Sequence, residues 1–257
     1  TYEVTDSSGN TATAVRTVNV VDTTAPEISI LGDNPATVEV GDAYVDAGAT
    51  AFDVGDGDLS VDITTTSTVD TSNVGSYTVT YEVTDSSGNT ATAVRTVNVV
   101  DTTVPLITIL GDNPATVEVG ESYVDAGATA ADVGDGDLTG SINTTSTVDT
   151  SNVGSYTVTY EVTDSSGNTT TAVRTVNVVD TIAPVITILG DNPATVEVGD
   201  SYVDAGATAF DVGDGDLSTD ITTTSTVDTS NVGSYSVTYE VTDSSGNTAM
   251  AVRTVNV

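Results

Sequence analysis

The chain repeats itself with a period of 79 residues. The segment TYEVTDSSGNT begins at four threonines, Thr1, Thr80, Thr159 and Thr238. A long period with nearly identical copies predicts an array of one structural unit. Cutting before the recurrent Asp-Thr gives three repeats, residues 22–100, 101–179 and 180–257. Residues 1–21 match only the last quarter of a repeat, so we interpret them as the C-terminal hairpin of a preceding one.

Each repeat shows the alternation of a half-buried strand. In residues 77–85, tyrosine and valine alternate with threonine and glutamate, which places the apolar side chains on one face. A Ser-Ser-Gly-Asn turn follows, and residues 91–100 form the returning strand of a predicted hairpin. Further strands are expected at residues 26–31, 37–40, 44–52 and 61–69. Nothing in the repeat predicts a helix of useful length.

About seven short strands separated by turns indicate a β-sandwich of immunoglobulin (Ig) type. The expected fold class is therefore all-β, with tandem Ig-like sandwiches joined by proline-containing linkers into an elongated rod. Arg95 interrupts the pattern, because it shares its phase with the inward-facing Val97 and Val99. Either a bulge intervenes, or Arg95 is semi-buried and paired with a carboxylate. We favour the pair.

Charge and missing residue types narrow the chemistry. The chain has 38 acidic and 4 basic residues, a net charge of −34, and no His or Cys. The basic residues are all arginine, so Schiff-base chemistry on lysine is excluded. Disulfides, thiolate metal sites and a histidine base are excluded as well. The strongly acidic surface that this net charge implies repels nucleic acid and anionic membranes and attracts cations. A small core with few aromatic residues favours structural ions.

The acidic stretch DVGDGDLS at residues 53–60 is the candidate cation site. Three carboxylates fall within six positions with glycines between them, and the stretch returns at residues 132–139 and 211–218. In an Ig-type sandwich, the linker aspartate and the aspartate of the last hairpin turn are expected at the same end. The predicted metal ligands are Asp22, Asp53, Asp56, Asp58 and Asp85, then Asp101, Asp132, Asp135, Asp137 and Asp164, then Asp180, Asp211, Asp214, Asp216 and Asp243.

Oxygen-only ligands without His or Cys favour Ca²⁺, which takes six to eight oxygens. The alternative is a solvated acidic loop in which the aspartates only cap turns. Differences between repeats show tolerance at other positions. Phe52 is replaced by Ala131, so it is not expected to anchor the core, and Glu27 is replaced by Leu106 and Val185, which indicates a surface position.

Three motifs carry a family resemblance: D-x-x-D-G-D-L-[ST], G-x-Y-x-V-x-Y-x-V-x-D-x-x-G-N and the closing R-T-V-x-V-x-D-x-x-x-P. With them the chain resembles a bacterial Ig-like domain. It is similar to repeats of insecticidal crystal toxins, hyalin-repeat modules and giant bacterial surface adhesins. The resemblance covers all three repeats and the leading segment. It implies a spacer or display element of a larger protein.

The sequence thus predicts a non-enzymatic extracellular spacer at the cell surface, made from part of a large adhesin or filament and stiffened by Ca²⁺. Its expected partners are the neighbouring repeats of the same chain, without nucleic acid or membrane insertion. One alternative is an adhesion module that binds carbohydrate or protein. Another is a self-assembling filament whose chains exchange strands, because the hairpin at residues 1–21 leaves strand edges unpaired.

Overall fold

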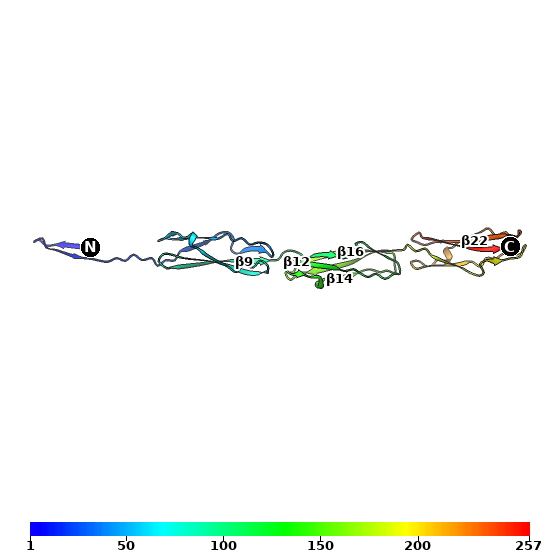
Figure 1. Ribbon diagram of the computed structural model, residues 1–257, viewed down its shortest axis with the longest axis horizontal. Helices are drawn as coiled ribbons and strands as arrows, with labels where there is room; N and C mark the ends of the chain where they lie inside the picture. The colour runs from blue at the N-terminus through cyan, green and yellow to red at the C-terminus, as the bar shows by residue number, and fades with distance from the viewer. The chain divides into compact units, whose positions relative to one another are not determined.

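The computed structural model describes all 257 residues, and its regular elements are strands apart from three short 3-10 turns (Figure 1). The chain divides into two compact units, Thr1–Thr103 and Val104–Val257. The first unit begins with a hairpin of β1 (Tyr2–Thr5) and β2 (Thr11–Ala14), whose strand residues are all exposed. The first complete repeat follows. No helix in the structure has the length and apolar character that crossing a membrane requires.

The first repeat consists of two sheets. The three-stranded sheet has the order β3 (Glu27–Ile30), β5 (Ala49–Asp53), β6 (Gly57–Asp58). The four-stranded sheet has the order β4 (Ala36–Glu39), β9 (Thr90–Val100), β8 (Gly75–Thr84), β7 (Thr64–Ser67). Strand β4 runs parallel to β9, and the other pairs are antiparallel. A 3-10 turn, η1 (Ser60–Asp62), connects the sheets.

The core lies between these sheets and follows the predicted alternation. Val79, Tyr81 and Val97 from β8 and β9 form its fully buried centre. Ile28 and Ile30 of β3 pack against this centre from the other sheet. Successive strand residues point to opposite faces, so one residue in two is available for the core. The predicted all-β, Ig-like sandwich is confirmed.

Arg95 is buried and paired, as we favoured. It is 2% exposed, and its Nη1 lies 2.7 Å from Oδ1 of Asp46. The ladder between β8 and β9 runs through Arg95 without a bulge. The guanidinium also donates to the main-chain oxygens of Leu31 and Gly48. The hydroxyl of Tyr81 donates to Asp46. Burial of the ring raises the pKa of Tyr81 most, the hydrogen bond to Asp46 and its charge add to the rise, and that pKa reaches about 12.

Strand β5 is shorter than predicted because the segment before it pairs with the buried arginine. The prediction began it at residue 44, but β5 begins at Ala49. In the preceding segment the side chain of Asp46 accepts hydrogen bonds from Tyr44, Tyr81 and Arg95. This segment therefore supplies the counter-charge of the buried arginine instead of pairing with a neighbouring strand.

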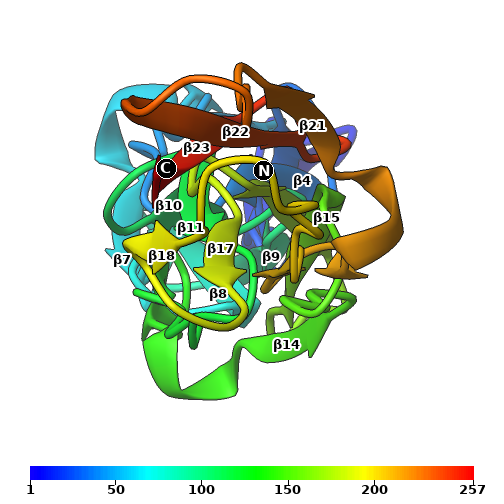
Figure 2. The same ribbon diagram turned by 90° about the vertical axis from the view of Figure 1, so that its right-hand side faces the viewer.

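The second unit contains two further copies of the sandwich. The middle repeat comprises β10 (Leu106–Ile109), β11 (Ala115–Glu118), β12 (Ala128–Asp132), β13 (Gly136–Asp137), η2 (Thr139–Ser141), β14 (Asn143–Ser146), β15 (Gly154–Thr163) and β16 (Thr169–Val179). The last repeat comprises β17 (Val185–Ile188), β18 (Ala194–Thr195), β19 (Ala207–Asp211), β20 (Gly215–Asp216), η3 (Ser218–Asp220), β21 (Thr222–Ser225), β22 (Ser234–Thr242) and β23 (Thr248–Asn256). Figure 2 shows the last repeat from its end, with β17 and β22 in separate layers.

Candidate metal centre

The acidic loop of the first repeat is folded around Asp53. This residue ends β5 and is 3% exposed, and its Oδ1 accepts the main-chain N–H groups of Gly55 at 2.6 Å and Asp56 at 3.1 Å. Gly57, directly after Asp56, adopts φ +86°, a conformation that costs glycine little, and begins β6. The loop is therefore a tight hairpin between β5 and β6.

The neighbouring hairpin turn, between β8 and β9, supplies another carboxylate, that of Asp85. Asp85 is 6% exposed, and its Oδ1 accepts the main-chain N–H groups of Ser87 and Asn89. Burial raises the pKa of Asp85, but hydrogen bonds from Asn89 outweigh it and leave that pKa below its ordinary value. Ser86 joins the two loops, because its hydroxyl donates to Oδ1 of Asp56 at 2.6 Å.

The linker contributes Asp22. Its Oδ1 accepts the N–H and hydroxyl groups of Thr24 at 3.1 and 2.8 Å. Its main-chain oxygen accepts the side-chain amide of Asn89 at 3.4 Å, which holds the linker against the β8–β9 turn. Its Oδ2 is buried and accepts no hydrogen bond. A buried carboxylate oxygen without a partner is costly.

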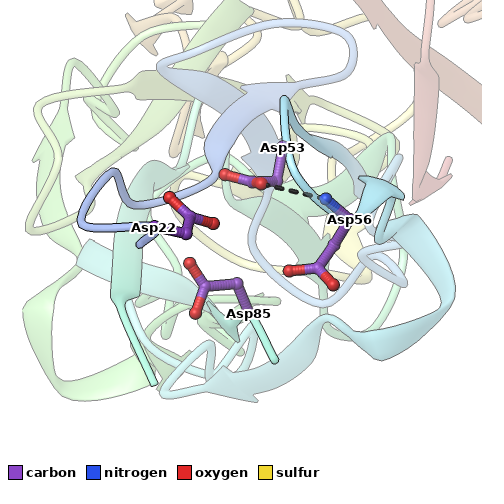
Figure 3. A group of neighbouring side chains, drawn as sticks. All are labelled: Asp22, Asp53, Asp56 and Asp85. Atoms are coloured by element: carbon purple, nitrogen blue, oxygen red, sulfur yellow. Dashed lines mark hydrogen bonds between the residues drawn. The ribbon is translucent and has the colours of Figure 1, made fainter. Parts of the chain in front are cut away.

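These elements gather four carboxylates, Asp22, Asp53, Asp56 and Asp85, each with an oxygen within 4.8 Å of the others. Figure 3 shows the side chains around one space, with Asp22 and Asp85 facing each other. Gly55 closes the loop against them: a Cβ at this position would lie 2.8 Å from Oδ2 of Asp22. A side chain there would therefore push the linker carboxylate out of place.

The last repeat has the same arrangement with Asp180, Asp211, Asp214 and Asp243, again within 4.8 Å of one another. Asp180 is 9% exposed, and its Oδ2 accepts no hydrogen bond. Burial raises the pKa of Asp180, and the charges of Asp211 and Asp243 add to the rise, which hydrogen bonds from Ile182 and Ser245 only partly offset. The surroundings therefore make ionisation of this carboxylate less favourable than in a solvated aspartate.

In the middle repeat, Asp132, Asp135 and Asp164 of the second unit also lie within 4.8 Å of one another. Ser165 donates to Asp135 through its N–H group at 2.9 Å, as Ser86 does to Asp56. Asp101, the linker aspartate of this repeat in the sequence, belongs to the first unit and is 7% exposed.

Three predicted ligands lie outside these groups: Asp58, Asp137 and Asp216. Asp58 caps the turn that follows β6, where its Oδ1 accepts the hydroxyl of Ser60 at 2.6 Å and the N–H group of Ser60 at 3.0 Å. These two hydrogen bonds, the hydroxyl first, lower the pKa of Asp58. In the β5–β6 ladder Asp58 pairs with Phe52, the residue before Asp53, so it lies on the sheet face opposite to that of Asp53.

Sequence reasoning missed the groups that orient the carboxylates, above all Ser86 and Asn89. The Asp-Ser-Ser-Gly-Asn spacing signals a turn in which the first aspartate accepts hydrogen bonds two and four residues on. It could have identified the Asn89 contacts. The bond from Ser86 to Asp56 spans 30 residues, and no local pattern announces it.

No cationic side chain neutralises the aspartate groups. The three ion pairs of the structure join Arg95 to Asp46, Arg174 to Asp125 and Arg253 to Asp204. Each carboxylate at the loops is instead held by N–H and hydroxyl groups. The arrangement can therefore bind a hard cation through oxygen.

Fold and site together define a class of protein: tandem Ig-like sandwiches with a cluster of aspartate carboxylates at one end of the repeat. The sequence matches the family described as "Bacterial surface protein, Ig-like domain" over residues 28–99, 107–178 and 186–257. The chain belongs to this family, and the bacterial Ig-like resemblance of the sequence is confirmed. It is an extracellular chain of the cell surface.

Similar curated proteins include two hyalins. The chain is 36% identical to hyalin of Lytechinus variegatus over 97% of its own length and 50% of the relative. It is also 36% identical to hyalin of Strongylocentrotus purpuratus over 100% of its length and 23% of the relative. The chain thus spans half or less of the hyalins it matches.

Among solved structures, the chain is similar to the protocadherin gamma B2 extracellular cadherin domains 3–6, at 15% identity with a TM-score of 0.35. This match covers 91% of the chain and 77% of the protocadherin structure.

Proposed function

We propose that this chain is a structural spacer of a bacterial surface protein, and that the first and the last repeat each bind one Ca²⁺ through four aspartates. The bound ion would tie the linker that enters a repeat to the two loops at that end. Neighbouring repeats of the same chain are then its main partners, and stiffness rather than catalysis is its contribution.

The unpartnered oxygen of the linker aspartate carries this proposal. Oδ2 of Asp180 is buried, accepts no hydrogen bond and belongs to a group of four carboxylates. The same oxygen of Asp22 is buried and unpartnered in the first repeat. Folding would not favour such an atom in a cluster of like charges unless a cation completes it.

The dimensions of the group suit Ca²⁺. Ligand oxygens lie about 2.3–2.6 Å from Ca²⁺, so oxygens on opposite sides of the ion are roughly 4.6–5.2 Å apart. The four carboxylates fall within 4.8 Å of one another. Main-chain oxygens and water would complete the six to eight ligands. Mg²⁺ requires a smaller octahedron and gives up its water reluctantly, so it suits this set less well.

Thermal unfolding of the full chain tests the proposal. Ligand that binds only the folded state stabilises it by about 2.7 kcal/mol at 100 times Kd. We therefore expect Tm to rise by several degrees in millimolar Ca²⁺ relative to chelator. Mg²⁺ at equal ionic strength should produce a smaller rise. An unchanged Tm in Ca²⁺ would contradict ion binding.

Two substitutions separate this proposal from simple turn capping. Asp180→Asn keeps the shape of the side chain and removes one charge of the group. In chelator it should leave Tm unchanged or raise it, because like-charge repulsion is relieved. In Ca²⁺ it should remove part of the stabilisation. The control is Asp58→Asn, which keeps an acceptor for Ser60 outside the group. A loss of Ca²⁺ stabilisation in the control equal to that in Asp180→Asn would overturn the ligand assignment.

A further inference from the structure

Both phenylalanines of the chain lie on its surface, at equivalent positions of two repeats. Phe52 and Phe210 are each 60% exposed, whereas Tyr81 and its counterparts fill the cores. The middle repeat has Ala131 at this position, and its strand pairs in the same register. Folding therefore does not require the aromatic ring. A single exposed apolar side chain is ordinary on a protein surface, so the inference depends on the groups that surround this ring.

The ring of Phe52 lies on the outer face of the three-stranded sheet. Glu27 of β3 pairs directly with Phe52, and so does Asp58 of β6 on the other side. Residues directly opposite each other in antiparallel strands have Cβ atoms about 4.5–5.5 Å apart and share a face of the sheet. The aromatic ring is thus flanked by a carboxylate on each neighbouring strand. Ser29, Thr50 and Ser60 complete a shallow pocket around it.

A guanidinium group matches this combination. Its planar cation stacks on aromatic faces, and its N–H groups form charge-assisted hydrogen bonds with carboxylates on either side. From this geometry we propose that the outer sheet face of the first repeat binds an arginine side chain of a basic partner protein. A second copy of the chain is a poor source. Its net charge of −34 opposes self-association, and three of its four arginines, Arg95, Arg174 and Arg253, are buried in ion pairs. Arg16 is exposed, so for this residue the charge argument alone applies.

The other two repeats supply partial versions of the same surface. The last repeat has Phe210 and Asp216 in register, but Val185 replaces the glutamate. The middle repeat keeps only one of the three side chains, Asp137. Leu106 replaces the glutamate, and Ala131 replaces the phenylalanine. We therefore expect the first repeat to bind arginine most tightly, the last repeat more weakly and the middle repeat most weakly.

Ring resonances of the two phenylalanines give a direct readout in the full chain. With Phe selectively labelled, the Phe210→Ala variant assigns the signals. N-acetyl-arginine amide is then titrated at fixed salt and saturating Ca²⁺, beside its neutral citrulline analogue. The Phe52 signals should shift and saturate with arginine, whereas those of Phe210 should need a higher concentration. Both rings belong to one molecule, so its overall negative charge affects them alike.

Two exposed substitutions sharpen the test, and both positions already vary between repeats. Glu27→Gln should weaken the arginine response of Phe52 by about two- to fivefold, the range of an exposed charge contact. Val185→Glu should strengthen that of Phe210 by a similar factor. Equal responses of the two rings that neither substitution changes would overturn the proposal, as would equal responses to arginine and citrulline. Absence of any saturable shift would overturn it too.

Discussion

At the scale of single residues, the chain buries three of its four arginines inside the repeats. Arg95 is buried, and Asp46, Tyr44 and two main-chain oxygens satisfy most of its donors. Its Nε remains without a hydrogen bond. A buried ion pair adds little net stability over an apolar core, but losing one partner leaves an uncompensated charge. Loss of Asp46 should therefore destabilise the first repeat.

We expect Asp46→Asn to destabilise the first repeat by about 3 kcal/mol, because Arg95 would remain buried without a counter-charge. Urea unfolding of the full chain should show an earlier transition for one repeat. Asp42→Asn is the matched control, since Asp42 is exposed and forms no ion pair; it should change stability by less than about 0.5 kcal/mol. Similar unfolding of both variants would contradict this role of the pair.

At the scale of elements, two hairpins and a linker create the carboxylate group. The β5–β6 hairpin presents Asp53 and Asp56, the β8–β9 turn presents Asp85, and the linker presents Asp22. Gly55 allows these elements to approach each other, because the loop passes too close to Asp22 for a Cβ. The geometry of the site thus depends on a glycine that is not itself a ligand.

Gly55→Ala should weaken Ca²⁺ binding at the first repeat roughly tenfold, since the added Cβ meets Oδ2 of Asp22 at 2.8 Å and misplaced ligand shells typically cost 10- to 100-fold in affinity. Calorimetric titration of the full chain should then resolve one weakened site. Gly140→Ala is the control, because a Cβ there meets nothing within 4 Å and Gly140 has no positive φ. Loss of affinity in both variants would contradict the steric argument.

At the scale of the whole molecule, the three repeats carry the same four aspartates in sequence, one of them in each linker. An ion that fixes a linker to the loops of its repeat restricts how the chain enters that repeat. In an array, each repeat would then add a fixed length, so copy number would set reach. The net charge of −34 supports this arrangement, because divalent cations would relieve self-repulsion.

Small-angle scattering of the full chain should detect this stiffening. Ca²⁺ is expected to narrow the distribution of end-to-end distances relative to chelator, because the linker carboxylates of Asp22 and Asp180 become ligands. A chain carrying Asp180→Asn should regain flexibility at one linker. Scattering that is identical with Ca²⁺ and chelator, while Tm still rises, would mean that the ions stabilise repeats without stiffening the array.

The sequence by itself determined the repeat, the strand alternation and the inward phase of Arg95, because strand periodicity and repetition are local properties. It also identified the aspartates that could hold a cation. Only the tertiary structure decided that Asp56 joins Asp22 and Asp85 whereas Asp58 caps a turn, and that Asp46 is the partner of Arg95. These contacts connect residues 29 to 63 positions apart (Asp56 with Asp85 and with Asp22, Asp22 with Asp85, Asp46 with Arg95). Such contacts depend on how loops close over the sandwich, which no local pattern encodes.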